Sequence, residues 1–125
     1  MKTQSAHELR LQAWWDETLI YSDQFFDTTA TLSAYDDEEM LPLFGELQSI
    51  RQSFANAEYP TTVSDARQCL LNSMAEVMLS FQAFFAGDAN AARLYMQTAQ
   101  YELHNLQQEM DRIGMGAMSG SGLVH

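Results

Sequence analysis

Two long amphipathic segments are separated by only four residues, Ala86-Gly87-Asp88-Ala89, and this spacing constrains the fold more than any other feature. In both segments the apolar residues lie three or four apart, which places them on one face of an α-helix. Because so short a connection leaves two helices side by side and antiparallel, the sequence predicts a helical hairpin. The expected buried faces are Ala66, Leu70, Met74, Val77, Phe81 and Phe84, followed by Ala92, Met96, Ala99, Leu103, Leu106, Met110 and Ile113.

The turn residues suit this hairpin. Gly87 can adopt the left-handed conformation that ends many helices, and Asp88 can accept hydrogen bonds from the free amides that begin the next helix. The small side chains of Ala92 and Ala99 allow a neighbouring helix to approach closely. We therefore expect tight packing along this seam.

A first helix is predicted to begin at Ser5-Ala6-His7-Glu8, which matches a capping box. Its apolar residues cover an arc of roughly 160°, wider than one helix–helix seam requires. The arc comprises Leu11, Trp14, Trp15, Thr18, Leu19, Phe25, Phe26, Thr29 and Leu32. Either this arc covers two neighbouring helices, or part of it contacts a partner protein, since aromatic residues are enriched at interfaces.

The partner-contact interpretation names seven residues of this first helix and its end. The apolar and aromatic candidates are Trp14, Ile20, Tyr21 and Tyr35. Asp16, Asp23 and Asp27 line the opposite side of the helix, and Ile20 lies among them without an obvious core partner.

The acidic run 36–39 is expected to stabilise the start of a second helix, because carboxylates offset the positive end of the helix dipole. Pro42 should then lie in the first helical turn. A divalent-metal site is the alternative interpretation of this run, but the ligand spacing of a calcium loop is missing. The expected core stripe of this helix is Leu43, Phe44, Leu47, Ile50, Phe54 and Ala57. Pro60 ends the segment, and Thr62 forms a weaker capping box with Asp65.

The 125 residues fit one domain, 1–113, followed by a flexible Gly/Ser/Met tail, 114–125. The formal net charge of -11 reflects 17 acidic but only 6 basic residues. Direct binding to nucleic acid or to an anionic membrane is disfavoured, since both need Lys or Arg clusters. The chain shows neither a membrane-spanning segment nor a secretory signal, so we expect a cytoplasmic protein.

No motif for catalysis was found, and we expect no enzyme activity. Cys69 is the single cysteine, so an internal disulfide is excluded. It lies at the border of an apolar face, where we interpret it as a structural thiol. Glu102 and His104 have the wrong spacing for a di-metal bundle, and His104 is expected to face solvent. A haem held between a methionine and His104 is the alternative for a helical bundle. The methionines lie mostly at positions expected in the core, so no cofactor is predicted.

One segment carries a family resemblance. Gly87-Asp88-x-x-x-Ala92-x-x-x-Met96-x-x-Ala99 resembles the turn and second helix of a tetratricopeptide repeat. The resemblance covers one hairpin, and that family typically binds peptides or proteins. It therefore implies a protein-binding role.

Together these patterns predict an all-α fold, an antiparallel up-and-down four-helix bundle, monomeric or dimeric, with helices near 5–35, 39–57, 63–86 and 89–113. The predicted function is a non-catalytic interaction module, such as a small acidic adaptor, accessory subunit or inhibitor, that binds a protein partner through the first helix. Its acidic surface suits a basic partner. One alternative is an acidic mimic of nucleic acid that inhibits a nucleic-acid-binding protein, and another is a bundle that binds haem or a metal.

Overall fold

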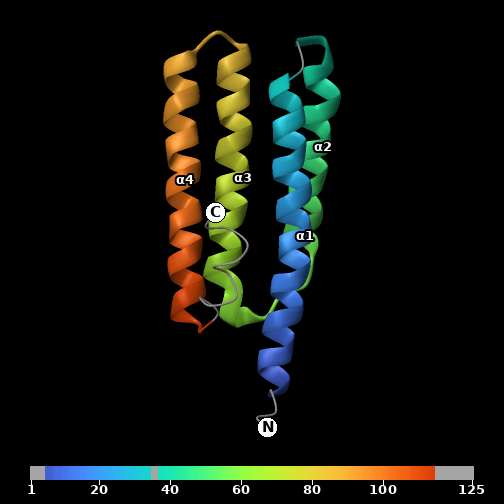
Figure 1. Cartoon of the computed structure of the whole chain (residues 1–125), viewed down its shortest axis with the longest axis vertical. Helices are drawn as coiled ribbons and strands as arrows, with labels where there is room; N and C mark the ends of the chain where they lie inside the picture. Colours follow the sequence, from blue (N-terminus) through green and yellow to red (C-terminus); the bar gives the residue numbers. More distant parts are fainter. Residues whose placement is uncertain (1–4, 35–36, 115–125) are drawn as a thin grey trace.

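The computed structural model describes residues 5–34 and 37–114, with the backbone alone for 32–34 and 37–40. Within these residues the chain is an antiparallel up-and-down bundle of four helices without strands (Figure 1). The helices are α1 (Ala6–Ala34), α2 (Asp37–Asn56), α3 (Ser64–Phe85) and α4 (Ala89–Arg112), and a short 3₁₀ helix, η1 (Thr61–Val63), precedes α3. The predicted fold class is confirmed. The predicted tail lies outside the described residues from 115 onward.

Two hairpins make up the bundle. Figure 1 shows α3 and α4 side by side along their whole length, with the α1–α2 pair beside α3. The helix ends follow local signals. Ser5 Oγ accepts a hydrogen bond from the Glu8 amide at 3.1 Å, and Asp88 Oδ1 accepts one from the Ala91 amide at 3.0 Å. Gly87 has a φ of 87°, so the predicted turn between α3 and α4 is confirmed.

One hydrophobic core connects the hairpins. α1 contributes Trp15 and Phe25, which are 1% and 0% exposed, and the other three helices contribute residues to the same cluster. The fully buried members from those helices include Leu47, Leu70, Met74, Leu106 and Met110. The wide apolar arc of α1 therefore faces the other helices along much of its length.

Small residues allow α3 and α4 to pack closely. Ala92 and Ala99 are buried, as predicted. Opposite them, the buried hydroxyls of Ser80 and Ser73 donate hydrogen bonds to the carbonyl oxygens of Ala92 and Ala99, at 2.6 and 3.1 Å. Each hydroxyl finds an acceptor on the neighbouring helix, so burial leaves neither serine unsatisfied.

Arginines join the two hairpins between α2 and α3. Arg51 Nε donates to the Leu71 carbonyl at 3.0 Å, and an Arg67 terminal nitrogen donates to the Ala55 carbonyl at 2.6 Å. The Arg67 guanidinium also lies over the Tyr59 ring, 4.3 Å from its centroid. Two of the chain's few cations thus fix the geometry between the hairpins.

Three local predictions were wrong. α2 begins at Asp37, so Pro42 lies in its second turn, because the acidic residues from Asp37 onward favour an earlier start. Thr62 does not cap α3, because Thr61–Val63 already form a helical turn that continues into it. Phe84 is 62% exposed rather than buried, because it lies in the last turn of α3, where little of the described chain packs over it.

Candidate functional site

An apolar groove lies between α3 and α4 at the end of their hairpin. It has a volume of about 560 Å³ and is lined by Ser80, Phe81, Phe84, Phe85, Ala89, Ala92, Arg93 and Met96. The turn at Gly87 sets its position, because ending α3 there places the last phenylalanines beside the first turns of α4. Such grooves are the usual location of ligand and partner contacts.

The groove is the uncovered continuation of the core. On the same face of α3, Leu70, Met74 and Val77 are 1%, 0% and 3% exposed, whereas Phe81 is half-buried and Phe84 is 62% exposed. Exposure therefore rises toward the turn. Within the described residues, this face is covered at the start and middle of α3 and becomes exposed near the turn, where α2 lies on the other side of α3 through Leu41 and Phe44.

Aromatic contacts shape the wall on the α3 side. Phe81 and Phe85 are stacked with centroids 6.5 Å apart, and Phe84 meets Phe85 edge-on at 5.7 Å. Phe85 also lines a second groove of about 290 Å³ toward α2, together with Leu41, Phe44, Gln82 and Ala86. An exposed apolar region of this kind marks a contact site in many proteins.

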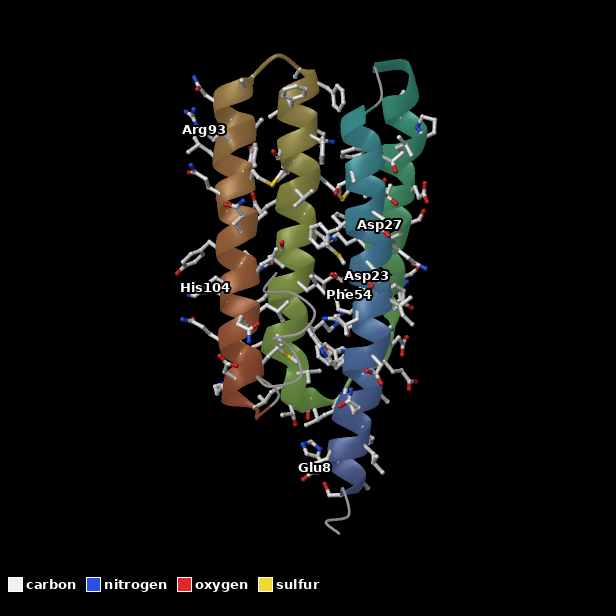
Figure 2. The ribbon with its side chains drawn as sticks, viewed as in Figure 1. Glu8, Asp23, Asp27, Phe54, Arg93 and His104 are labelled. Carbon is white, nitrogen blue, oxygen red and sulfur yellow. The ribbon has the colours of Figure 1, made fainter. Side chains whose placement is uncertain are left out.

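Arg93 provides the charge at the rim. It is the one ionisable residue lining either of these two grooves within the described part of the chain. Its guanidinium donates to Asn90 Oδ1 at 3.2 Å, and it forms no ion pair with the residues that the structure describes. Figure 2 shows Arg93 on α4 near the hairpin turn. Among the described residues, no acidic side chain lines these grooves, although the chain as a whole is strongly acidic.

The predicted aromatic contacts of α1 are mostly covered. Trp14 is 6% exposed. It lines a cleft of about 390 Å³ with both polar and apolar walls, together with Arg10, Ala13, Glu17, Glu58, Tyr59 and Pro60. Tyr21 is half-buried and packs against Phe54, with ring centroids 5.6 Å apart. Tyr35 lies outside the described residues. A partner contact through these rings stays a prediction.

The predicted polar stripe of α1 faces solvent. Ile20 is 58% exposed, as expected for a residue without a core partner, and Asp16, Asp23 and Asp27 are exposed. Figure 2 shows Asp23 and Asp27 along α1. Gln12 Nε2 donates to Asp16 Oδ1 at 2.8 Å. These four residues share one face, whereas Trp14 and Tyr21 lie elsewhere on the helix, so the structure does not bring the predicted set together.

The groups considered for cofactor or redox chemistry are dispersed. His104 is exposed, as predicted, and its Nε2 lies 3.4 Å from Gln108 Nε2. No three His, Cys, Asp or Glu residues are grouped to hold a metal ion in the described residues. Cys69 is half-buried, and burial, followed by the negative charge of Glu102, raises the pKa of its thiol.

Among the described helices, none combines the length and apolar character needed to cross a membrane. Searches against protein families, curated proteins and solved structures found no match to this chain.

The groove is not evident from the sequence, because the apolar spacing predicts a buried Phe84. A signal was present: Phe81, Phe84 and Phe85 form a dense aromatic cluster immediately before Gly87. A helix end carries fewer covering neighbours than a helix centre, so such a cluster favours partial exposure.

Proposed function

We propose that this protein is a non-catalytic interaction module that binds a protein partner in the groove lined by Phe81, Phe84, Phe85 and Met96. The exposure of Phe84 carries this proposal. A phenylalanine that is 62% exposed beside an apolar groove leaves a large unfavourable contact with water, which a partner would remove.

Two further observations support the proposal. The core runs without interruption into the groove, so a docked partner would extend packing that already exists. The resemblance of the 87–99 segment to one tetratricopeptide hairpin also implies protein binding. The cytoplasmic location and the role as adaptor, accessory subunit or inhibitor stay predictions.

The experiment compares affinity capture by three forms of the full chain, with mass spectrometry of the bound proteins. These are the wild type, Phe84→Glu, and Leu94→Glu as a matched control, since Leu94 is 60% exposed on α4 but does not line the groove. We expect a partner that the wild type and Leu94→Glu retain and that Phe84→Glu loses. Because Phe84 is largely exposed, the variant should keep a native circular dichroism spectrum. Equal capture by all three forms would contradict the proposal.

A further inference from the structure

The open groove and Arg93 together indicate which chemistry a partner must offer. We propose, on the basis of the function proposed above, that the docked segment is an amphipathic helix of the partner that carries a carboxylate beside its apolar residues. The inference rests on the shape of the groove and on the charge at the rim.

A helix fits because helices already cover the same face. Nearer the start of α3, the first hairpin buries Leu70 and Met74 with residues such as Trp15 and Phe25. Figure 1 shows α1 running alongside α3 in this region. A partner helix seated on Phe81, Phe84 and Met96 would continue this arrangement, with apolar anchors three or four residues apart.

The two methionines that follow Gly114 are too close to the end of α4 to supply this contact. α4 ends at Arg112, 16 residues after Met96, so its far end lies about 24 Å from the nearest wall of the groove. The four residues 115–118 can extend their backbone at most about 14 Å beyond Gly114. Met115 and Met118 therefore cannot reach Phe84.

The rim charge selects the polar group of the partner. Arg93 lacks an ion pair within the described residues, whereas Arg112 on the same helix pairs with Glu109 at 2.8 Å. A basic segment would bring like charge to Arg93, while a carboxylate would gain a charge-assisted hydrogen bond. The net charge of -11 opposes an acidic partner at long range, but salt screens exposed charges beyond about 8 Å at physiological ionic strength.

The test selects binders from a naive phage-displayed library of helical peptides, using the full chain as target. We expect the selected peptides to be lost with Phe84→Glu and retained with Leu94→Glu. We also expect them to be enriched in Asp or Glu next to the apolar stripe. Synthetic peptides with that acid should bind Arg93→Gln about two- to fivefold more weakly than the wild type. Arg112→Gln, at the other end of α4, should leave their affinity unchanged.

A charge exchange makes the test specific. Replacing the peptide's acid with lysine should weaken binding to the wild type and restore part of the affinity for Arg93→Glu. Peptides that need Phe84 but show no acidic preference would overturn this inference and leave the proposed function standing. The absence of any peptide sensitive to Phe84→Glu would count against the proposed function itself. Sedimentation that reveals a dimer dissociated by Phe84→Glu would assign the groove to a second copy and also overturn the inference.

Discussion

The Ser73 hydroxyl on α3 donates a hydrogen bond across the hairpin to the carbonyl oxygen of Ala99 on α4, at 3.1 Å. Ser80 repeats this contact with Ala92 at 2.6 Å. Seven residues separate the two serines, and seven separate the two alanines, so both bonds report the same antiparallel register. The hairpin is thus aligned by polar contacts inside an otherwise apolar seam.

Removing these hydroxyls should destabilise the fold in equal, independent steps. We expect Ser73→Ala and Ser80→Ala each to lower the free energy of unfolding by about 1 kcal/mol, because each loses one buried hydrogen bond. The two sites share no partner, so the double variant should lose the sum. Urea denaturation followed by circular dichroism measures all three. Ser53→Ala, on the exposed face of α2, is the control. If Ser73→Ala and Ser80→Ala lower the free energy of unfolding no more than the control does, the two hydrogen bonds do not contribute to stability.

Ala99→Leu should overpack the same seam. Ala99 is 1% exposed, and a larger side chain would push α3 and α4 apart, at a cost of about 1 to 3 kcal/mol. Gln100→Leu changes the next, exposed position and should leave the melting temperature nearly unchanged. A thermal melt of Ala99→Leu that matches the wild type would contradict the close approach of the two helices.

The two glycines Gly45 and Gly87 should respond to alanine in opposite directions. A methyl group at either position meets no atom within 4 Å, so backbone conformation alone decides the result. Gly45 lies inside α2, and Gly45→Ala should stabilise the protein by about 0.5 to 1 kcal/mol. Gly87 has a φ of 87°, and Gly87→Ala should destabilise it by about 1 kcal/mol. Denaturation midpoints that move in the same direction would refute this assignment.

Trp14 and Ile20 should separate a structural role from a binding role on α1. Trp14→Ala should cost about 3 to 5 kcal/mol, because it empties a buried site. Ile20→Ala should change stability by less than about 0.5 kcal/mol, since Ile20 is 58% exposed. Weaker capture of a partner by Ile20→Ala, with unchanged unfolding, would identify the α1 stripe as a second contact surface. Loss of capture by Trp14→Ala alone would reflect unfolding.

Cys69 should react slowly and at an elevated pH. Burial and the negative charge of Glu102 raise the pKa of its thiol, so the folded protein holds the thiol proton more tightly than the unfolded chain. The stability linked to this group is present below the ordinary thiol pKa and falls as the pH rises past it. Iodoacetamide alkylation against pH should show a higher midpoint for folded than for urea-unfolded protein. Glu102→Gln should lower the folded midpoint, whereas Glu8→Gln, whose charge does not act on this thiol, should not. A midpoint equal in both states would be inconsistent with the burial.

The sequence predicts those features that local chemistry specifies. Gly87 and Asp88 fix the turn, Ser5 fixes the start of α1, and the near-heptad spacing of α4 fixes its buried face. These signals act within a few residues, so a single chain displays them. The four-helix architecture follows, because each apolar face needs a neighbour.

Features that depend on distant residues were not predictable in the same way. The apolar pattern that places Met74 in the core also places Phe84 there, although only the first is covered by the other hairpin. Ser73 and Ser80 are polar, so a search for apolar positions does not identify them as buried. Their spacing nevertheless matches that of Ala92 and Ala99. The open groove depends on how the other helices are placed around the last turn of α3, which no local residue encodes.

The seven-residue repeat of small side chains has a consequence for the connection at 86–88. Sliding α4 by two helical turns would set Ser73 against Ala92, so the hydroxyl contacts by themselves tolerate more than one alignment. The short loop and the loss of one of the two hydroxyl contacts both oppose the slide. Inserting about seven flexible residues at Gly87 would allow α3 and α4 to pack in two competing registers. In the shifted register the residues that line the groove would no longer lie beside one another.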